Sequence, residues 1–176
     1  MNGISVRLAT AALLAVALTC CQFRPPKALT REALLNAQYG SEWVTGGVVT
    51  LTDGQFSAQA GPGSRLRMNV KLSQWWALGD LDSDGVDEAA AVLVTQTGGA
   101  ATFVDLAVMR NKRGTPRFLT GVNLGDRVRV DGLTIKAGVV EVKLVQHGDA
   151  DDMCCPTEHV TYRWELIEGA LVPLAE

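Results

Sequence analysis

Apolar and polar residues alternate along much of this chain. The segments 66–72, 139–145 and 160–166 each place apolar side chains at every second position, with polar or charged residues between them. Because successive side chains of a strand point to opposite faces of a sheet, this pattern predicts strands with one buried and one exposed face. Such strands are typical of antiparallel sheets. The runs 89–94 and 103–109 are apolar almost throughout, which predicts central strands.

Short polar segments that contain glycine separate these runs, among them TDGQ, TGGA, NKRGTP, VDGL and IEGA. Gly, Asn and Asp tolerate the backbone conformations that tight turns need. We therefore predict a mainly β protein in which roughly eight to ten short strands form a single antiparallel meander. Such a meander has to curl into a sandwich or an open barrel to cover its edges.

One segment, ALTREALLNAQYG at residues 28–40, has the pattern of a helix. Thr30 can cap the first turn, and Leu29 can pack on Leu34 across that cap. Gly40 is a typical residue just after the end of a helix. The segment therefore predicts one short N-terminal helix that ends at Gly40 and packs on the β domain.

The N-terminus has the pattern of an export signal. Arg7 precedes the apolar run LATAALLAVAL, which is too short to span a bilayer but suits a secretory signal. The following LTCC is similar to the end of a bacterial lipoprotein signal, in which a cysteine is lipidated and becomes the new N-terminus. The position of Leu18 favours Cys21 as that cysteine, with Cys20 as the alternative. An ordinary cleaved signal is a third possibility.

The resemblance to lipoprotein signals implies a signal peptide at 1–20, a tether at 21–28 and a single β-rich domain at 29–176. Pro25 and Pro26 favour the extended backbone of a tether. Acyl chains such as palmitate would anchor the exported protein to the bacterial envelope. The membrane would be the outer membrane where one exists, and otherwise the cell membrane.

The composition indicates neither a nucleic-acid partner nor a reaction. The chain has 176 residues, with 16 Lys and Arg against 19 Asp and Glu, so its net charge of −3 indicates no nucleic-acid-binding surface. The sequence contains no serine-hydrolase elbow, phosphate-binding loop or metalloprotease motif. Trp75 and Trp76 would face opposite ways in a strand, which favours a core role over a sugar-binding platform. We expect a non-enzymatic protein with a binding or scaffold role in the cell envelope.

Five carboxylates crowd into the nine positions of 80–88, in the sequence GDLDSDGVDEAA. Asp80, Asp82 and Asp84 alternate ahead of a glycine, as oxygen ligands do in the calcium loop of an EF-hand. The glutamate that closes an EF-hand loop is missing, because Ala91 stands at its position and a strand follows. This loop is therefore not an EF-hand.

The shorter pattern D-x-D-x-D-G-x-x-D/E, followed directly by an apolar strand, resembles the calcium loops of FG-GAP and VCBS-type β-propeller repeats. This resemblance implies a structural Ca²⁺ ion held by Asp80, Asp82, Asp84, the carbonyl of Val86, and Glu88. The loop occurs once, so the propeller fold itself is not implied. Two carboxylates roughly 4 Å apart repel by about 4 kcal/mol at an effective dielectric near 20, which favours a bound cation. The alternative is an Asp- and Gly-rich turn that needs no metal.

A second group of metal-binding residue types occurs in HGDADDMCCPTEH. Cys154 and Cys155 are adjacent and lie between His147 and His159, the only histidines of the chain. Paired thiols outside the cytoplasm tend to form a disulfide, and this structural bridge is the favoured interpretation. A copper or zinc site that also uses Met153, and free or intermolecular thiols, are the alternatives. The alternative function is therefore a metal-binding or redox-active envelope protein.

Most of the predicted mature chain resembles a family of uncharacterised bacterial secreted proteins and lipoproteins. The resemblance runs from GDLDSDGVDEAAAVLV through TGGAATFVDLAV and LGDRVRVDGL to HGDADDMCCPT. It implies no activity, so the function has to be inferred from the residues themselves.

Overall fold

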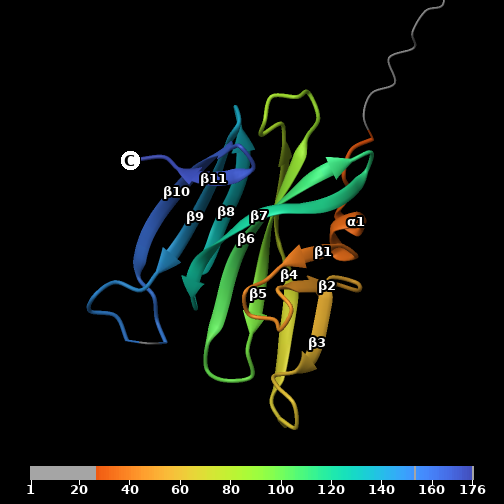
Figure 1. Ribbon diagram of the computed structural model, residues 1–176. Coiled ribbons are helices and arrows are strands. Elements are labelled where there is room, and N and C mark those ends of the chain that lie inside the picture. The colour runs from red at the N-terminus through yellow and green to blue at the C-terminus, as the bar shows by residue number, and fades with distance from the viewer. Residues whose placement is uncertain (1–26, 153, 176) are drawn as a thin grey trace, which may run out of the picture.

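The computed structural model describes residues 27–152 and 154–175. Within these ranges the chain forms eleven strands and one short helix, arranged in three layers (Figure 1). An N-terminal layer covers one face of a five-stranded sheet, and a four-stranded sheet covers the other. The prediction of a mainly β, antiparallel protein with one short N-terminal helix is confirmed, and the two larger sheets form a sandwich.

Both larger sheets are antiparallel meanders, in which neighbours in the sequence are neighbours in the sheet. The first sheet consists of β3 (Gln55–Gln59), β4 (Arg67–Gly79), β5 (Glu88–Gln96), β6 (Thr102–Lys112) and β7 (Thr115–Asp126). The second consists of β8 (Arg129–Lys136), β9 (Val139–Gln146), β10 (Glu158–Ile167) and β11 (Ala170–Pro173). β8 contacts β4 and β11 contacts β7, so the second sheet lies across the face of the first.

The hairpin turns follow from local sequence. Arg113–Gly114, Ala137–Gly138 and Glu168–Gly169 each connect two strands through two residues with positive φ. This turn geometry matches the right-handed twist of the paired strands, and glycine adopts its second position without steric cost. In each of these three turns, the residue that follows the glycine is the first residue of the next strand.

β5 is the central strand of the first sheet and is buried on both faces. Ala89, Ala91 and Leu93 pack against the N-terminal layer, whereas Ala90 and Val92 pack against the second sheet. Small side chains at most of these positions allow the layers to approach closely from both sides. The apolar run at 89–94 is thus the central strand that the sequence predicts.

The N-terminal layer consists of α1 (Arg31–Leu35), β1 (Gln38–Gly40) and β2 (Val48–Thr50). Thr30 caps α1, because its Oγ1 accepts a hydrogen bond from the Ala33 amide at 3.2 Å. Leu29 and Leu34 are both buried in the core, as the predicted contact across the cap requires. Burial of a leucine side chain of this kind contributes about 1.5–3 kcal/mol to stability.

The prediction that the helix extends to Gly40 is wrong. α1 ends at Leu35, and Gly40 lies in β1, where it pairs with Val48. Tyr39 is fully buried against the first sheet and its hydroxyl donates to the Leu34 carbonyl at 2.8 Å. Packing of Tyr39 and pairing with β2 therefore override a helical pattern that is too short to be stable alone.

Trp75 and Trp76 lie on opposite faces of β4, as expected for neighbours in a strand. Trp76 packs against the core beneath the N-terminal layer, and Trp75 packs against the core between the two sheets. Both are therefore partly buried core residues, which agrees with the interpretation favoured from the sequence.

The predicted signal peptide at 1–20, Cys20, Cys21 and most of the tether lie outside the described residues. The helix of the described part is far too short and polar to cross a bilayer. Export and lipidation therefore stay predictions.

Candidate metal centre

The acidic loop connects β4 to β5 at one end of the first sheet, in the yellow-green part of the chain in Figure 1. Gly79, the last residue of β4, pairs with Glu88, the first residue of β5. Leu81 is buried in the core between the two sheets and anchors the start of the loop. The antiparallel pairing thus brings the two acidic ends of the loop, Asp80 and Glu88, close together.

Three of the loop carboxylates form a cluster. One oxygen from each of Asp80, Asp82 and Glu88 lies within 4.8 Å of the others. In the part of the chain that the structure describes, this is the one group of three potential metal-ligating side chains with such spacing. Glu88 is only 1% exposed, Asp80 is half-buried, and Asp82 is exposed. The cluster therefore combines a carboxylate with almost no access to solvent and one that reaches solvent.

Backbone amides hold two of these carboxylates in place. The Leu81 amide donates to Glu88 Oε2 at 3.2 Å, and the Gly85 amide donates to Asp80 Oδ2 at 3.0 Å. Gly85 has a φ of 82°, which lets the loop turn back on itself. The second oxygen of Asp80, Oδ1, is buried and has no hydrogen-bond partner among the described residues. A buried oxygen of this kind is costly unless a ligand such as a metal ion satisfies it.

The electrostatics of the cluster favour a cation. Burial raises the pKa of Glu88 above its ordinary value, and the negative charges of the neighbouring Asp82, Asp84 and Asp80 raise it further, against the opposing effect of the Leu81 amide. These are the two causes that disfavour an ionised carboxylate.

Arg110 of β6 compensates part of this charge. Its Nη2 lies 3.6 Å from Asp82 Oδ2 at the solvent-exposed side of the cluster. An exposed pair of this kind contributes only about 0–1 kcal/mol, so it does not balance the buried carboxylate. The sequence alone does not reveal this contact, because Arg110 comes from a different strand.

The structure brings together three of the five predicted ligands. Asp84 is exposed, and its Oδ1 accepts a hydrogen bond from the Val86 amide at 2.8 Å. Asp84 is therefore not part of the three-carboxylate cluster, and its role as a ligand, like that of the Val86 carbonyl, stays a prediction. Asp87 is also exposed and does not belong to the three-carboxylate cluster.

Cys154 and Cys155 are joined in a disulfide, as the favoured interpretation of the sequence predicts. Both residues are exposed, in the loop between β9 and β10. Asp151 organises this loop: its Oδ2 accepts from the amides of Gly148 at 2.9 Å and Thr157 at 2.7 Å, and its Oδ1 accepts from the Thr157 hydroxyl at 2.7 Å. Hydrogen bonds therefore shape the loop together with the disulfide.

Within the described residues, the two histidines and the cysteines do not form a group of side chains that could hold a metal ion. His147 Nε2 is buried without a hydrogen-bond partner in that same part of the chain, whereas His159 is exposed on β10. Met153, the other proposed soft ligand, lies outside the described residues. The alternative of a soft-metal or redox site therefore stays a prediction.

Comparison of the chain with protein-family models, curated proteins and solved structures found no match. The resemblance of the loop to FG-GAP and VCBS-type loops, and of the chain to secreted bacterial lipoproteins, therefore rests on the quoted residues alone. The function has to be argued from the geometry of the acidic cluster.

Replacement of Glu88 should change how the metal-free protein responds to pH. Because the folded-state pKa of Glu88 is raised above its ordinary value of 4.5, the folded chain holds this proton more tightly than the unfolded chain. The stability that this proton contributes is fully present when the pH is below the unfolded-state pKa. It is lost as the pH rises through the folded-state pKa. Glu88→Gln removes that loss, so its stability relative to wild type should increase as pH rises.

Urea unfolding at a series of pH values, with a chelator present throughout, measures this difference. Glu32→Gln, which changes an exposed glutamate of α1, is the matched control and should follow the wild-type profile. If the free energy of unfolding depends on pH in the same way in Glu88→Gln and wild type, the ionised form of Glu88 is not disfavoured in the folded protein.

Proposed function

We propose that the protein is an exported, lipid-anchored component of the bacterial envelope, and that its acidic loop binds one calcium ion as a structural element. One observation carries the calcium proposal: oxygens of Asp80, Asp82 and Glu88 gather within 4.8 Å of one another although Glu88 is almost fully buried. A buried carboxylate beside like charges is costly unless it is protonated or paired with a cation.

The chemistry of the ligands favours calcium over other metals. The cluster offers carboxylate oxygens alone, which are hard ligands, whereas zinc and copper prefer nitrogen and sulfur. Calcium accepts an irregular shell of six to eight oxygens, so the Val86 carbonyl, Asp84 and water can complete the shell around the three carboxylates. Magnesium demands a stricter octahedral shell, which a loop of this kind is less suited to provide.

The position of the loop supports a structural role. An ion held by Asp80 and Glu88 would tie the end of β4 to the start of β5, the strand that is buried on both faces. The neighbouring Leu81 belongs to the core between the two sheets. Calcium would therefore stabilise the sandwich itself, and we expect a non-enzymatic binding or scaffold role for the protein.

Calorimetric titration of the chelator-treated mature protein tests the calcium proposal. We expect one ion per chain with a dissociation constant of about 10⁻⁵ to 10⁻⁴ M, in the range between calcium sensors and extracellular calcium modules. Loss of a charged ligand should cost about 1.5–3 kcal/mol, so Asp80→Asn and Glu88→Gln should each weaken binding about tenfold to a hundredfold. Magnesium should not compete at equal concentration.

Asp149→Asn is the matched control for these variants, because Asp149 is exposed in the loop between β9 and β10. This variant removes the same single charge and should leave the affinity for calcium unchanged. An absence of heat at millimolar calcium, or equal loss in Asp149→Asn, would overturn the proposal.

The sequence of the N-terminus supports the anchoring part of the proposal, with Cys21 as the lipidated residue. Cells that express the full chain should incorporate labelled palmitate into the protein and retain it in the membrane fraction. Cys21→Ser should abolish the label, whereas Cys20→Ser should keep it. Label that is lost only in Cys20→Ser would place the lipid on that residue instead, and an unlabelled wild-type protein would contradict lipid anchoring.

A further inference from the structure

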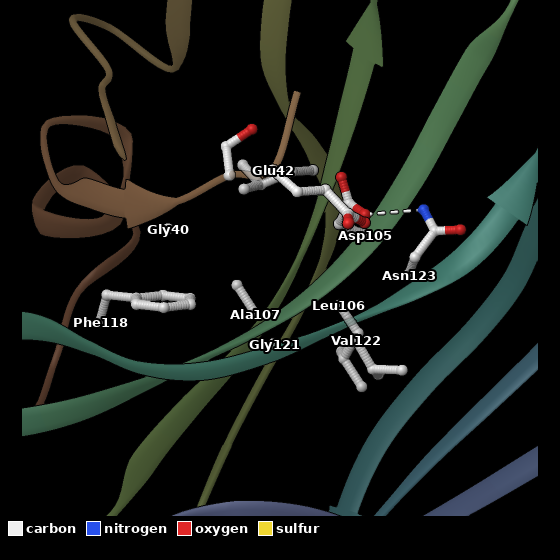
Figure 2. A pocket seen from close by; sticks show the side chains of 11 residues that line it. Gly40, Glu42, Asp105, Leu106, Ala107, Phe118, Gly121, Val122 and Asn123 are labelled. Atoms are coloured by element: carbon white, nitrogen blue, oxygen red, sulfur yellow. Dashed lines mark hydrogen bonds between the residues drawn. The ribbon is translucent and has the colours of Figure 1, made fainter. Parts of the chain in front are cut away.

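A cavity of about 290 Å³ lies between the end of β1 and strands β6 and β7, on the face of the first sheet beneath the N-terminal layer (Figure 2). Its floor is made by Ala107 of β6 and Gly121 of β7, which are paired across the two strands. A Cβ at Gly121 would lie 2.9 Å from the Leu106 carbonyl oxygen and 3.5 Å from the Phe118 ring, so the glycine lets this ring lie close to the strand pair. The cavity therefore has a floor of small residues and the Phe118 ring at its side.

The two ends of the cavity differ in chemistry. Figure 2 shows the Phe118 ring on one side of Ala107, and the carboxylate of Asp105 with the amide of Asn123 on the other. Asp105 and Asn123 form a second cross-strand pair of β6 and β7. A ligand in the cavity would thus meet an aromatic wall at one end and a carboxylate at the other.

The Asp105 carboxylate is held in place by two neutral donors. Trp43 Nε1 donates to Oδ2 at 2.8 Å, and Asn123 Nδ2 donates to Oδ1 at 2.8 Å. Trp43 in turn stacks on Phe103 of β6, with ring centroids 3.6 Å apart and nearly parallel planes. The stacking fixes the loop between β1 and β2 on the sheet, so the carboxylate is positioned before any ligand arrives, which reduces the cost of binding.

The cavity carries negative charge without a cation of its own. Glu42 also lines it, and no lysine, arginine or histidine does so. Neither Asp105 nor Glu42 takes part in an ion pair among the described residues. Burial raises the pKa of Asp105, and the charge of Glu42 raises it further, although the hydrogen bonds from Asn123 and Trp43 act against this. A bound cation would remove this penalty.

A further polar group points to a ligand at the same place. Ser41 lines the cavity, and its Oγ is buried with no hydrogen-bond partner in the part of the chain that the structure describes. Buried hydroxyls normally have a partner, and an N–H group of a ligand would supply one.

We propose that this cavity binds a small organic ammonium ion with an apolar body. The ammonium group would lie beside Asp105 and Glu42, and the body would lie over Ala107 against the ring of Phe118. At roughly 30 Å³ for each non-hydrogen atom, the volume suits a molecule of about ten such atoms. A neutral ligand would leave both carboxylates unpaired, and a bare metal ion would leave the apolar volume empty. The proposal shares no residue with the acidic cluster and does not depend on calcium.

Phenethylamine is a suitable probe, because it joins a primary ammonium group to a phenyl ring in a molecule of this size. Phenethyl alcohol is the neutral control of the same shape, and phenylacetate is the anionic one. With the mature protein in calcium-containing buffer, we expect amide shifts in the NMR spectrum at Gly40, Gly121 and Asn123 on addition of the amine. A charged hydrogen bond is worth about 1.5–3 kcal/mol, so the alcohol should bind about tenfold to a hundredfold more weakly.

Variants separate charge recognition from a general apolar contact. Asp105→Asn retains an acceptor for the Trp43 hydrogen bond. It should weaken the binding of phenethylamine about tenfold or more and leave the binding of phenethyl alcohol unchanged. Glu42→Gln changes an exposed residue, so it should not affect folding. It should also weaken the binding of phenethylamine. Asp149→Asn, the distant control, should bind like wild type.

Equal affinity for amine and alcohol would overturn the proposal. So would an absence of shifts at millimolar amine, or unchanged amine binding in both Asp105→Asn and Glu42→Gln. Loss of calcium binding in the acidic loop would leave these expectations unaffected, which keeps the two proposals separately testable.

Discussion

Repulsion among carboxylates at the connection between β4 and β5 is the constraint on which our account of this protein depends. Glu88 is the buried first residue of a strand that is covered on both faces, so its carboxylate meets the other loop carboxylates with little access to solvent. On the other side of the loop, a Cβ at Gly79 would overlap Ile135 of β8, so β4 and the second sheet also meet closely here. A cation at this point would therefore stabilise one hairpin and the junction of two sheets together.

Features set by neighbouring residues could be predicted from the sequence. The strands follow from alternation, and the approach of Asp80 and Glu88 follows from a hairpin that brings its two ends together. The extent of α1 could not be predicted, because the burial of Tyr39 depends on a sheet formed later in the chain. The cavity could not be predicted for the same reason, because Trp43 and Asp105 meet across 62 positions of sequence.

The two proposed cation sites differ in their surroundings and therefore in the kind of cation that each would favour. In the acidic loop, several carboxylates converge and the ligands are oxygen atoms alone, which favours a hard divalent ion. In the cavity, the positioned carboxylate of Asp105 and the exposed Glu42 lie at one end and an aromatic ring at the other, which favours an organic ammonium ion with an apolar body. On these proposals, an ion at the first site would stabilise the fold, and the second site would bind a small molecule on the scaffold so formed.

Thermal unfolding of the mature protein, with calcium and then with chelator, tests the central claim most directly. A dissociation constant between about 10⁻⁵ and 10⁻⁴ M means that about 1 mM calcium should add roughly 1.4 to 2.7 kcal/mol. For a domain of this size we expect the melting temperature to rise by roughly 3 to 10 °C, and this rise should be clearly smaller in Glu88→Gln, whose affinity for calcium is weakened. Equal melting temperatures with and without calcium would show that the acidic loop holds its carboxylates together without a metal ion.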